Sequence, residues 1–475
     1  MSEPIEKTAS SESTTPDLVR QLGLFDSTML TVGIVIGAGI FISPNIVANF
    51  LPSPGLILLA WFAGGLLMLF GALTFAELGA AMPEAGGQYA FFRKAFGPLA
   101  GFLFGWVFFV VYYNGVIAYM SISFARYLSV FFPSLATDNI IFSQTITAFG
   151  QSWEYSLSVG QIAAVGLIAF LSTIGFLGVR FGKAVQNSVT LVKIAVILVF
   201  IVAGLTMKVE NQINFTLNPG GIGLGELMMG FGLALIPASI AFDGWHCLMF
   251  MGSEVKDPGK NVTRSLFIGT AIILIVYLLM NLVYLRALPM DELAASTKVA
   301  EDAALALYGK GASGIVSAAV VISIFGALNG IILAGPRIYY AMARDGLFFR
   351  RAAQVHPRFK TPGFAILIQA IWASVLTMSG TVGPLMMFVM VAGISFWAIT
   401  AVALLVLRRR HPDMPRPYKT WGYPVVPIVF ILASVGILAN TLMGRPIESF
   451  TAIGLTLLGI PVYYVWLGLL KRKSA

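Results

Sequence analysis

The stretch Thr31-Val-Gly-Ile-Val-Ile-Gly-Ala-Gly-Ile-Phe41 places three glycines inside an apolar segment that is long enough to cross a membrane. Each glycine in a helix interior costs roughly 0.5–1 kcal/mol relative to alanine, so three in one span require a reason. Gly33 and Gly37 have the spacing that lets two membrane helices pack closely. The alternative, which we favour, is a helix that is interrupted near the middle of the bilayer.

A second apolar stretch supports an interruption, because it contains its own breaks. Pro237 cannot continue the helical hydrogen bonds, and Phe242-Asp-Gly-Trp245 adds a charge and a flexible residue in the middle of the segment. These two stretches are the first and the sixth along the chain, and a repeat of five spans turns the second copy upside down. Interrupted helices at corresponding positions of two inverted halves indicate the binding site of a transporter.

The composition places the remainder of the chain in the bilayer. Of the 475 residues, 58% are hydrophobic and only 11% are charged, which is too little polar surface for a water-soluble protein. The net charge of +9 is divided into short runs between apolar stretches, a pattern that orients membrane spans and does not indicate nucleic-acid binding. The single cysteine, Cys247, excludes an intrachain disulfide and a cysteine-based metal site.

We therefore predict an all-α membrane protein with 12 transmembrane helices. The apolar stretches are 28–50, 55–80, 98–131, 158–177, 186–207, 224–252, 266–288, 313–343, 363–380, 384–408, 425–443 and 449–470. The predicted units are a disordered cytoplasmic tail, two inverted repeats of five spans each, the last two spans and a short cytoplasmic tail. Their ranges are 1–27, 28–207, 224–408, 425–470 and 471–475.

Lysine and arginine are unequally distributed between alternate loops. The side that carries both termini holds 22 of the 30 basic residues and the other side holds six, so we predict a multi-pass protein of the plasma (cell) membrane with both termini cytoplasmic. Lys193 and Arg337 lie within spans, and Arg337 is expected to reach the headgroups with its long side chain. Glu77 and Glu254 lie toward the cytoplasmic ends of their spans. Two interpretations of these carboxylates stay open: salt bridges that form a gate, and charges exposed to solvent.

An interrupted helix exposes backbone groups that can bind both ends of an α-amino acid. The amides at the start of its second half can bind a carboxylate. The carbonyls at the end of its first half can accept hydrogen bonds from an ammonium group. The residues expected to offer amides are Ala38, Gly39 and Ile40, and those expected to offer carbonyls are Val35, Ile36, Ala241 and Phe242. We also expect Phe242 to act as a lid and Gly244 to border the site. Asn329 either lines the site or makes an interhelical hydrogen bond.

Four motifs occur in order along roughly residues 20–470. They are Ile36-Gly-Ala-Gly-Ile-Phe41, Pro83-Glu-Ala-Gly-Gly-Gln-Tyr89, Phe242-Asp-Gly-Trp245 with Ser253-Glu-Val-Lys-Asp-Pro258, and Ala327-Leu-Asn-Gly330 through Gly335-Pro-Arg-Ile-Tyr-Tyr-Ala-Met-Ala-Arg-Asp-Gly-Leu-Phe348. With them the chain resembles the amino acid-polyamine-organocation superfamily, and within it the L-type amino acid transporters and their bacterial relatives. The resemblance implies a leucine-transporter-type five-plus-five inverted repeat with broken helices 1 and 6, and alternating access around a central amino acid site.

The resemblance also assigns a role to Lys193, which matches a lysine of the fifth span in this family. Sodium-coupled members of the wider fold bind a cation near this place, so the ammonium group would substitute for sodium, tether the broken first span or carry a proton. The alternative is a lysine that reaches toward the cytoplasmic headgroups. Many relatives have glycine at the position of Asp243, whose carboxylate either bonds the broken backbone or Trp245, or favours a cationic substrate.

Partner-dependent L-type transporters carry a cysteine between spans three and four, and residues 132–157 contain none. We therefore expect no disulfide-linked heavy subunit; the expected partners are an amino acid and the lipid bilayer.

The function favoured by these observations is sodium-independent exchange or facilitated transport of neutral L-amino acids. A proton-coupled symporter and a cationic amino acid or polyamine transporter remain alternatives on the same fold, and an amino acid sensor is an alternative of a different class. We do not expect an enzyme or a cofactor. His246 and Cys247 are adjacent, so helical side chains there would diverge by about 100° and would not form a catalytic pair.

Overall fold

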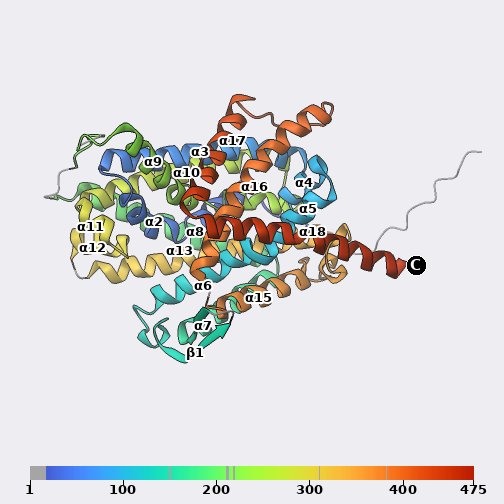
Figure 1. The fold of residues 1–475 in the computed structure, drawn as a ribbon, viewed down its shortest axis with the longest axis horizontal. Helices are drawn as coiled ribbons and strands as arrows, with labels where there is room; N and C mark the ends of the chain where they lie inside the picture. The colour runs from blue at the N-terminus through green and yellow to red at the C-terminus, as the bar shows by residue number, and fades with distance from the viewer. Residues whose placement is uncertain are drawn as a thin grey trace, which may run out of the picture.

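The computed structural model describes residues 18–148, 151–209, 213–217, 220–309, 311–380 and 382–474, which form a bundle of long helices (Figure 1). The helices of the first half are α1 Leu24–Val35, α2 Gly39–Ala48, α3 Pro54–Ala81, α4 Gln88–Phe96, α5 Pro98–Val107, α6 Tyr113–Leu128, α7 Val159–Phe176 and α8 Val179–Thr206. Those of the second half are α9 Leu224–Ala241, α10 Pro258–Ala287, α11 Met290–Ala295, α12 Val299–Tyr308, α13 Ala312–Ala334, α14 Pro336–Arg344, α15 Gly363–Met378, α16 Val382–Arg410, α17 Val425–Gly444 and α18 Pro446–Ser474.

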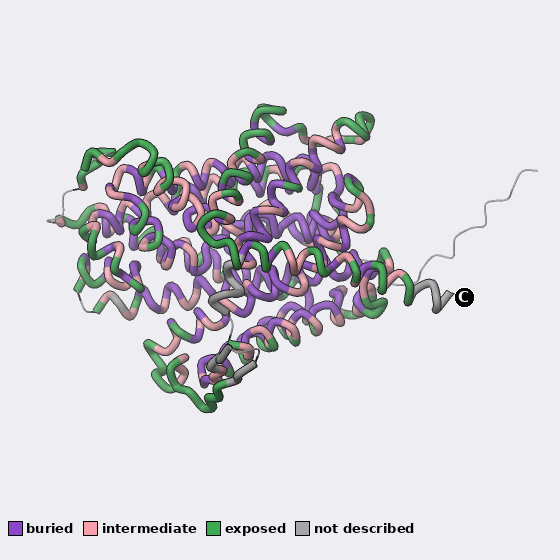
Figure 2. The backbone as a smooth tube through the Cα atoms, in the orientation of Figure 1, coloured by how far each residue is buried: buried purple, intermediate pink, exposed green. Residues whose placement is uncertain are grey.

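Within these described ranges, ten helices are long and apolar enough to span a membrane, and the bent pair of α1 and α2 brings the number to as many as 11. The apolar helix α15, at the ninth predicted span, has only 16 residues. Buried residues fill the centre of the bundle and exposed ones lie at its margins (Figure 2). Many of the exposed side chains are large and apolar, for example Leu198, Val199 and Val202 on α8. Such a surface fits hydrocarbon and not water.

Local sequence explains where several spans begin. The Ser53 side chain accepts a hydrogen bond from the Leu56 amide at the start of α3, and Pro54 occupies the first helical position. At the start of α7, Ser158 and Gln161 satisfy each other's backbone amides. The third predicted span consists of α5 and α6 joined by a π-helical turn, Phe108–Tyr112, a feature that often occurs at functional sites.

The loop between α6 and α7 departs from the all-α prediction. Strands β1 Ile140–Ala148 and β2 Gln151–Ser158 pair antiparallel in it as a two-stranded hairpin. The partial alternation of apolar and polar residues in Ile140–Ala148 is typical of a strand, but it is shorter than the apolar stretches that predict membrane helices.

The N-terminal prediction is corrected in part. Residues 1–17 lie outside the described part of the chain, but α1 begins at Leu24, within the predicted tail. The amides of Gln21 and Leu22 donate to the Glu254 carbonyl over 2.8 and 2.9 Å, and the Lys256 amide donates to the Leu22 carbonyl over 2.8 Å. This short bridge ties the chain before α1 to the segment before α10. At the other end, α18 continues to Ser474, through most of the predicted C-terminal tail.

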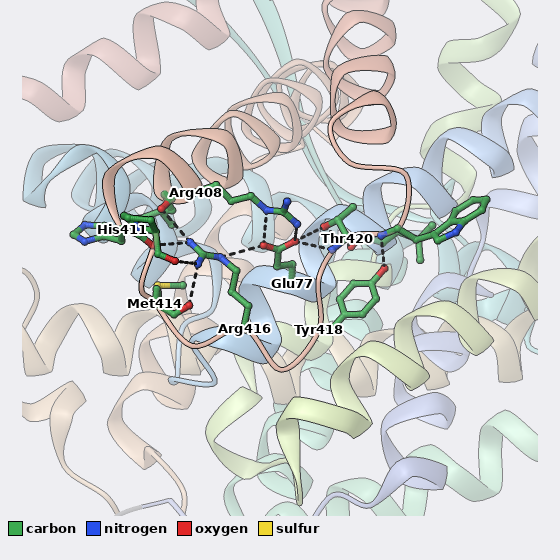
Figure 3. A network of polar contacts seen from close by, with 11 residues as sticks. Glu77, Arg408, His411, Met414, Arg416, Tyr418 and Thr420 are labelled. Atoms are coloured by element: carbon green, nitrogen blue, oxygen red, sulfur yellow. Dashed lines mark hydrogen bonds and ion pairs between the residues drawn. The ribbon is translucent and has the colours of Figure 1, made fainter.

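The segment between α16 and α17 is held by a buried carboxylate. Glu77 of α3 is 1% exposed and lies between Arg408 of α16 and the side chains of Arg416 and Thr420, as Figure 3 shows. Arg408 also stacks over the Tyr423 ring, 3.6 Å from its centre. Of the two possibilities for Glu77, a solvated charge is therefore wrong, and the residue joins α3 to the end of α16 and to the segment that follows it.

Candidate functional site

The first interruption lies where the glycine pattern predicts it. Helix α1 ends at Val35, α2 begins at Gly39, and the two axes differ by 44°. Gly33 lies before the break and packs on α8: a Cβ there would come within 2.2 Å of side-chain atoms of Gln186 and Thr190. The two interpretations of the glycines are thus both correct, at different positions. Gly33 permits close packing, and the residues from Ile36 to Ala38 form the break.

The second interruption touches the first. Helix α9 ends at Ala241, and after the turn Phe242-Asp243-Gly244 the chain continues as a short 3₁₀ helix, Trp245–Phe250. A Cβ on Gly39 would lie only 2.8 Å from the Ala241 Cα, so no larger residue fits between the two breaks. Pro237 lies inside α9, one turn before the break, and does not itself end the helix.

Gly244 is required at the second interruption, and we expect its replacement by alanine to be harmful. Its φ is +104°, which side chains rarely adopt, and an added Cβ would lie 2.5 Å from Ile34 Cγ2. We expect Gly244→Ala to destabilise the protein by about 1–3 kcal/mol and to lower substrate binding. The measurement is thermal unfolding in detergent with and without substrate. Gly166→Ala is the matched control, because a Cβ at Gly166 meets nothing within 4 Å; equal effects of the two substitutions would contradict the prediction.

A cavity of about 140 Å³ lies between the two interruptions. Five of the predicted substrate-binding residues line it, namely Val35, Ala38, Gly39, Ala241 and Gly244. Drug-sized ligands occupy pockets of roughly 300–1,000 Å³, so this cavity suits a much smaller molecule. A larger apolar groove of about 1,090 Å³ lies between α7 and α15. Among the side chains that the structure describes, its lining includes no charged one and no residue of either break.

The other residues that were predicted to line the site lie away from this cavity. The Ile36 carbonyl accepts from Lys193, Ile40 is buried, and neither residue borders the cavity. The Phe242 ring packs against Trp61 and Tyr277, with ring centres 6.1 and 4.8 Å away, so its expected position as a lid over this cavity is wrong.

Asn329 makes interhelical hydrogen bonds, which were the second of the two possibilities considered for it. Its amide donates to the Gly182 carbonyl over 3.1 Å and to the Gln186 side chain over 2.8 Å. It therefore joins α13 to α8 and does not border the cavity.

Tyr277 of α10 is a site residue that sequence reasoning missed. Its hydroxyl lies 2.9 Å from the Val35 carbonyl and 3.1 Å from the Ala241 carbonyl, so it bridges the ends of α1 and α9. These are two of the carbonyls expected to accept from an ammonium group. The Val35 carbonyl also accepts from the Gly37 amide over 2.7 Å, whereas the Ala241 carbonyl keeps a second lone pair. A tyrosine in the middle of a mostly apolar span was the available signal.

Lys193 is fully buried in α8, at 1% exposure. Its ammonium group donates to the carbonyls of Gly33, Ile36 and Ser323 over 2.9, 2.8 and 2.9 Å. All three protons of the ammonium group therefore have acceptors, and the side chain does not reach toward headgroups. Two of the acceptors lie at the end of α1 and the third lies on α13, so Lys193 joins the broken span to two neighbouring helices.

Asp243 bonds the broken backbone, the first of the roles considered for it. One carboxylate oxygen accepts from the Gly244 amide over 2.7 Å, and the other accepts from the Tyr112 hydroxyl over 2.7 Å. The residue also lines the cavity, and its side chain is 22% exposed. The π-helical turn that ends at Tyr112 brings this hydroxyl to the second interruption. The carboxylate is thus held in place while part of it faces the cavity.

Ion pairs close the end of the bundle at which α1 begins. Glu254 and Arg337 form a doubly bonded pair over 2.6 and 3.1 Å, with side chains 1% and 0% exposed. The predicted contact of Arg337 with headgroups is therefore wrong, because a carboxylate 83 residues earlier in the chain binds it inside the protein.

Two further ion pairs lie at the same end, Asp26 with Lys183 and Arg93 with Asp345. Tyr89 donates to Asp345 over 2.7 Å, and burial together with this carboxylate raises the pKa of Tyr89. Toward the opposite end the cavity is bordered by α2, whose Ile46 is 41% exposed. The cavity is thus nearer to solvent on the α2 side than on the α1 side.

Comparison with known proteins gives consistent matches along most of the chain. The family model described as "Amino acid permease" matches residues 22–466. The serine/threonine exchanger SteT of Bacillus subtilis is 32% identical over 461 residues, which cover 96% of this chain and 98% of that protein. The human large neutral amino acids transporter small subunit 2 is 30% identical over 452 residues, covering 94% of this chain and 80% of that protein. The human cystine/glutamate transporter is 30% identical over 451 residues, covering 95% and 86%.

Proposed function

The chain belongs to the amino acid permease family, and on this premise we propose that it exchanges neutral L-amino acids across the cell membrane by alternating access and without sodium. The observation that carries the proposal is the small cavity between two interrupted helices that touch at Gly39 and Ala241. The first turn of α2 begins at this cavity, and the amides of a first helical turn bind carboxylates well. Relatives named as exchangers or transporters of amino acids support the same function.

We infer a 12-helix arrangement in which α15 is the ninth span and the first ten spans form two inverted repeats of the leucine-transporter type. The positions of the two interrupted spans along the chain, α1 with α2 first and α9 with the 3₁₀ helix Trp245–Phe250 sixth, support this arrangement. The distribution of basic residues supports cytoplasmic termini. With that orientation, the ion pairs at the α1 end form a closed cytoplasmic gate, and the cavity is nearer to the outside.

Within this proposal the predicted residues have distinct roles. The amides at Ala38 and Gly39 bind the substrate carboxylate, and the Ala241 carbonyl accepts from its ammonium group. Lys193 occupies the place of a coupling cation and fixes the broken span, which explains transport without sodium. The absence of a cysteine in residues 132–157 supports function without a disulfide-linked heavy subunit.

Uptake of radiolabelled amino acids into proteoliposomes tests the proposal. We expect rapid uptake when the vesicles contain unlabelled amino acid, slow uptake into empty vesicles, and no dependence on sodium or on a pH gradient. Protein-free liposomes provide the control. Uptake into empty vesicles that follows a pH gradient would replace exchange by proton coupling.

Competition against the labelled substrate separates the remaining substrate classes. Neutral L-amino acids should compete, whereas lysine, arginine and polyamines should not. Strong competition by these cations would show that the Asp243 carboxylate faces a positive substrate charge, and the function would then be cationic amino acid or polyamine transport. Binding of an amino acid with no movement across the bilayer would instead support a sensor.

A further inference from the structure

The apolar groove between α7 and α15 lies at the margin of the bundle and belongs neither to the central cavity nor to the gate. The two helices pack side by side (Figure 1). Small side chains from both of them line the groove, among them Ala169 on α7 and Ala370 and Ser374 on α15. Leu367 and Ile371 also line it, and each is 54% exposed. The groove therefore opens to the surroundings of the protein along a stripe of α15.

The walls of this groove offer little hydrogen bonding. The Thr173 hydroxyl is donated to the Ala169 carbonyl over 2.8 Å, and the Ser374 hydroxyl to the Ala370 carbonyl over 2.7 Å. Both helices cross the membrane in the arrangement inferred above, so the opening of the groove faces hydrocarbon. A chain of methylene groups fits such a space, whereas an amino acid or a peptide would leave its polar groups without partners.

Positive charges lie just beyond one end of the groove. Phe176, the last residue of α7, lines that end, and the segment before α15 packs against it. The Phe359 ring lies 5.5 Å from the Phe176 ring, and the Thr361 hydroxyl donates to the Phe176 carbonyl over 2.9 Å. Arg358, which is exposed, and Lys360, which is partly exposed, flank Phe359 in this segment. The contacts of Phe359 thus hold two basic residues beside the groove.

The turn between α7 and α8 brings a third basic residue to the same place. A Cβ on Gly178 would lie 3.3 Å from the Phe359 carbonyl, so the turn and the segment before α15 are in contact. Arg180 follows two residues later and is exposed. No side chain caps the start of α8 at Val179, so the first amides of this helix lie next to Arg180.

These basic side chains have no counter-charge in the protein. Within the ranges that the structure describes, none of Arg180, Arg358 and Lys360 forms an ion pair with a carboxylate. Lys183, one turn after Arg180, is paired with Asp26 near the start of α1. The three charges therefore lie at the end of the bundle at which α1 begins, which is the cytoplasmic end in the orientation proposed above.

We propose that the groove between α7 and α15 is a binding site for an anionic phospholipid, with acyl chains along the groove and the phosphate at Arg180, Arg358 and Lys360. Guanidinium and ammonium groups bind phosphate oxygens well, and uncapped helical amides add to this attraction. Basic pockets between membrane helices on the cytoplasmic side bind anionic headgroups. The inference does not depend on which solute the protein transports.

Lipid titration of the purified and delipidated protein tests the inference. The probes are dioleoyl phosphatidylglycerol and dioleoyl phosphatidylcholine, which have the same acyl chains and differ in headgroup charge, and inorganic phosphate, which has no chains. Native mass spectrometry measures bound lipid, and thermal unfolding in detergent measures stabilisation. We expect phosphatidylglycerol to bind at least about tenfold more tightly than phosphatidylcholine, and inorganic phosphate to leave the unfolding midpoint unchanged. Equal affinities of the two lipids, or equal stabilisation by inorganic phosphate, would overturn the inference.

Removal of two positive charges tests the headgroup end. The double variant Arg180→Gln with Lys360→Gln should bind phosphatidylglycerol at least about tenfold more weakly, with binding of phosphatidylcholine unchanged. Lys260→Gln is the matched control, because Lys260 is exposed in the first turn of another helix, α10. It should keep the affinity for phosphatidylglycerol within twofold. Equal weakening by the control would mean that the lipid responds only to the overall charge of the protein, against a site in this groove.

Filling the groove tests the acyl-chain end. Ala169→Phe from α7 and Ser374→Phe from α15 each place a ring in the groove, so two variants with different effects on folding address the same space. Each should weaken binding of phosphatidylglycerol at least about tenfold, because displaced methylene groups lose their burial. Gly436→Phe on α17 is the control, since a Cβ there meets nothing within 4 Å and the residue lies outside the groove. Unchanged affinity in both groove variants would place the lipid elsewhere and overturn the inference.

Discussion

Replacement of Glu254 by alanine is expected to destabilise the folded protein by about 3–5 kcal/mol, because it leaves the Arg337 guanidinium buried without its counter-charge. Arg337 is 0% exposed, and its bonds apart from those to Glu254 go to the Leu333 carbonyl. The backbone of Glu254 also holds Gln21 and Leu22, so the loss is expected to loosen the chain before α1. The measurement is the midpoint of thermal unfolding in detergent.

Two controls separate the lost charge from the lost side chain. A double variant, Glu254→Leu with Arg337→Met, removes both charges and should recover most of the stability, since apolar replacements of buried ion pairs are often neutral. Lys298→Ala breaks the pair with Glu301, in which the lysine is 34% exposed, and should cost less than about 1 kcal/mol. A loss from Glu254→Ala no larger than that from Lys298→Ala would show that the buried pair contributes little.

The parts of this structure that the sequence predicts depend on local patterns. Apolar stretches of membrane length predict the spans, and the glycines around Gly37 together with Asp243-Gly244 predict where two of them break. These features follow from backbone hydrogen bonding and conformational freedom, which neighbouring residues determine. The positions of five cavity-lining residues could therefore be predicted without knowledge of the packing.

The parts that escaped prediction depend on contacts between distant residues. Arg337 binds a carboxylate 83 residues away, and the Tyr277 hydroxyl meets carbonyls from two other helices. Phe242 is adjacent to the break but points away from the cavity. A single sequence shows how close a residue lies to a break along the chain, but the direction of its side chain is decided by the rotation and packing of whole helices.

Lys193 is the residue whose replacement is expected to reduce transport most. Lys193→Ala removes hydrogen bonds to three buried carbonyls, and bonds that involve a charged group contribute about 1.5–3 kcal/mol each. If alternating access requires the end of α1 to move together with α8 and α13, loss of even two of these bonds corresponds to at least about a 100-fold lower exchange rate. The measurement is the initial rate of amino acid exchange per amount of folded protein.

A control at another lysine and a second substitution of Lys193 complete this test. Lys208→Ala, at an exposed position two residues past the end of α8, removes an equal charge and should leave exchange close to that of the unaltered protein. A rate for Lys193→Ala within twofold of the unaltered protein would refute a role for the three carbonyl contacts.

Lys193→Gln distinguishes the remaining roles of the ammonium group. Its amide retains hydrogen-bond donors without charge, so partial exchange in that variant would indicate a mainly structural tether, whereas full loss would indicate that the positive charge itself is needed in the place of a cation.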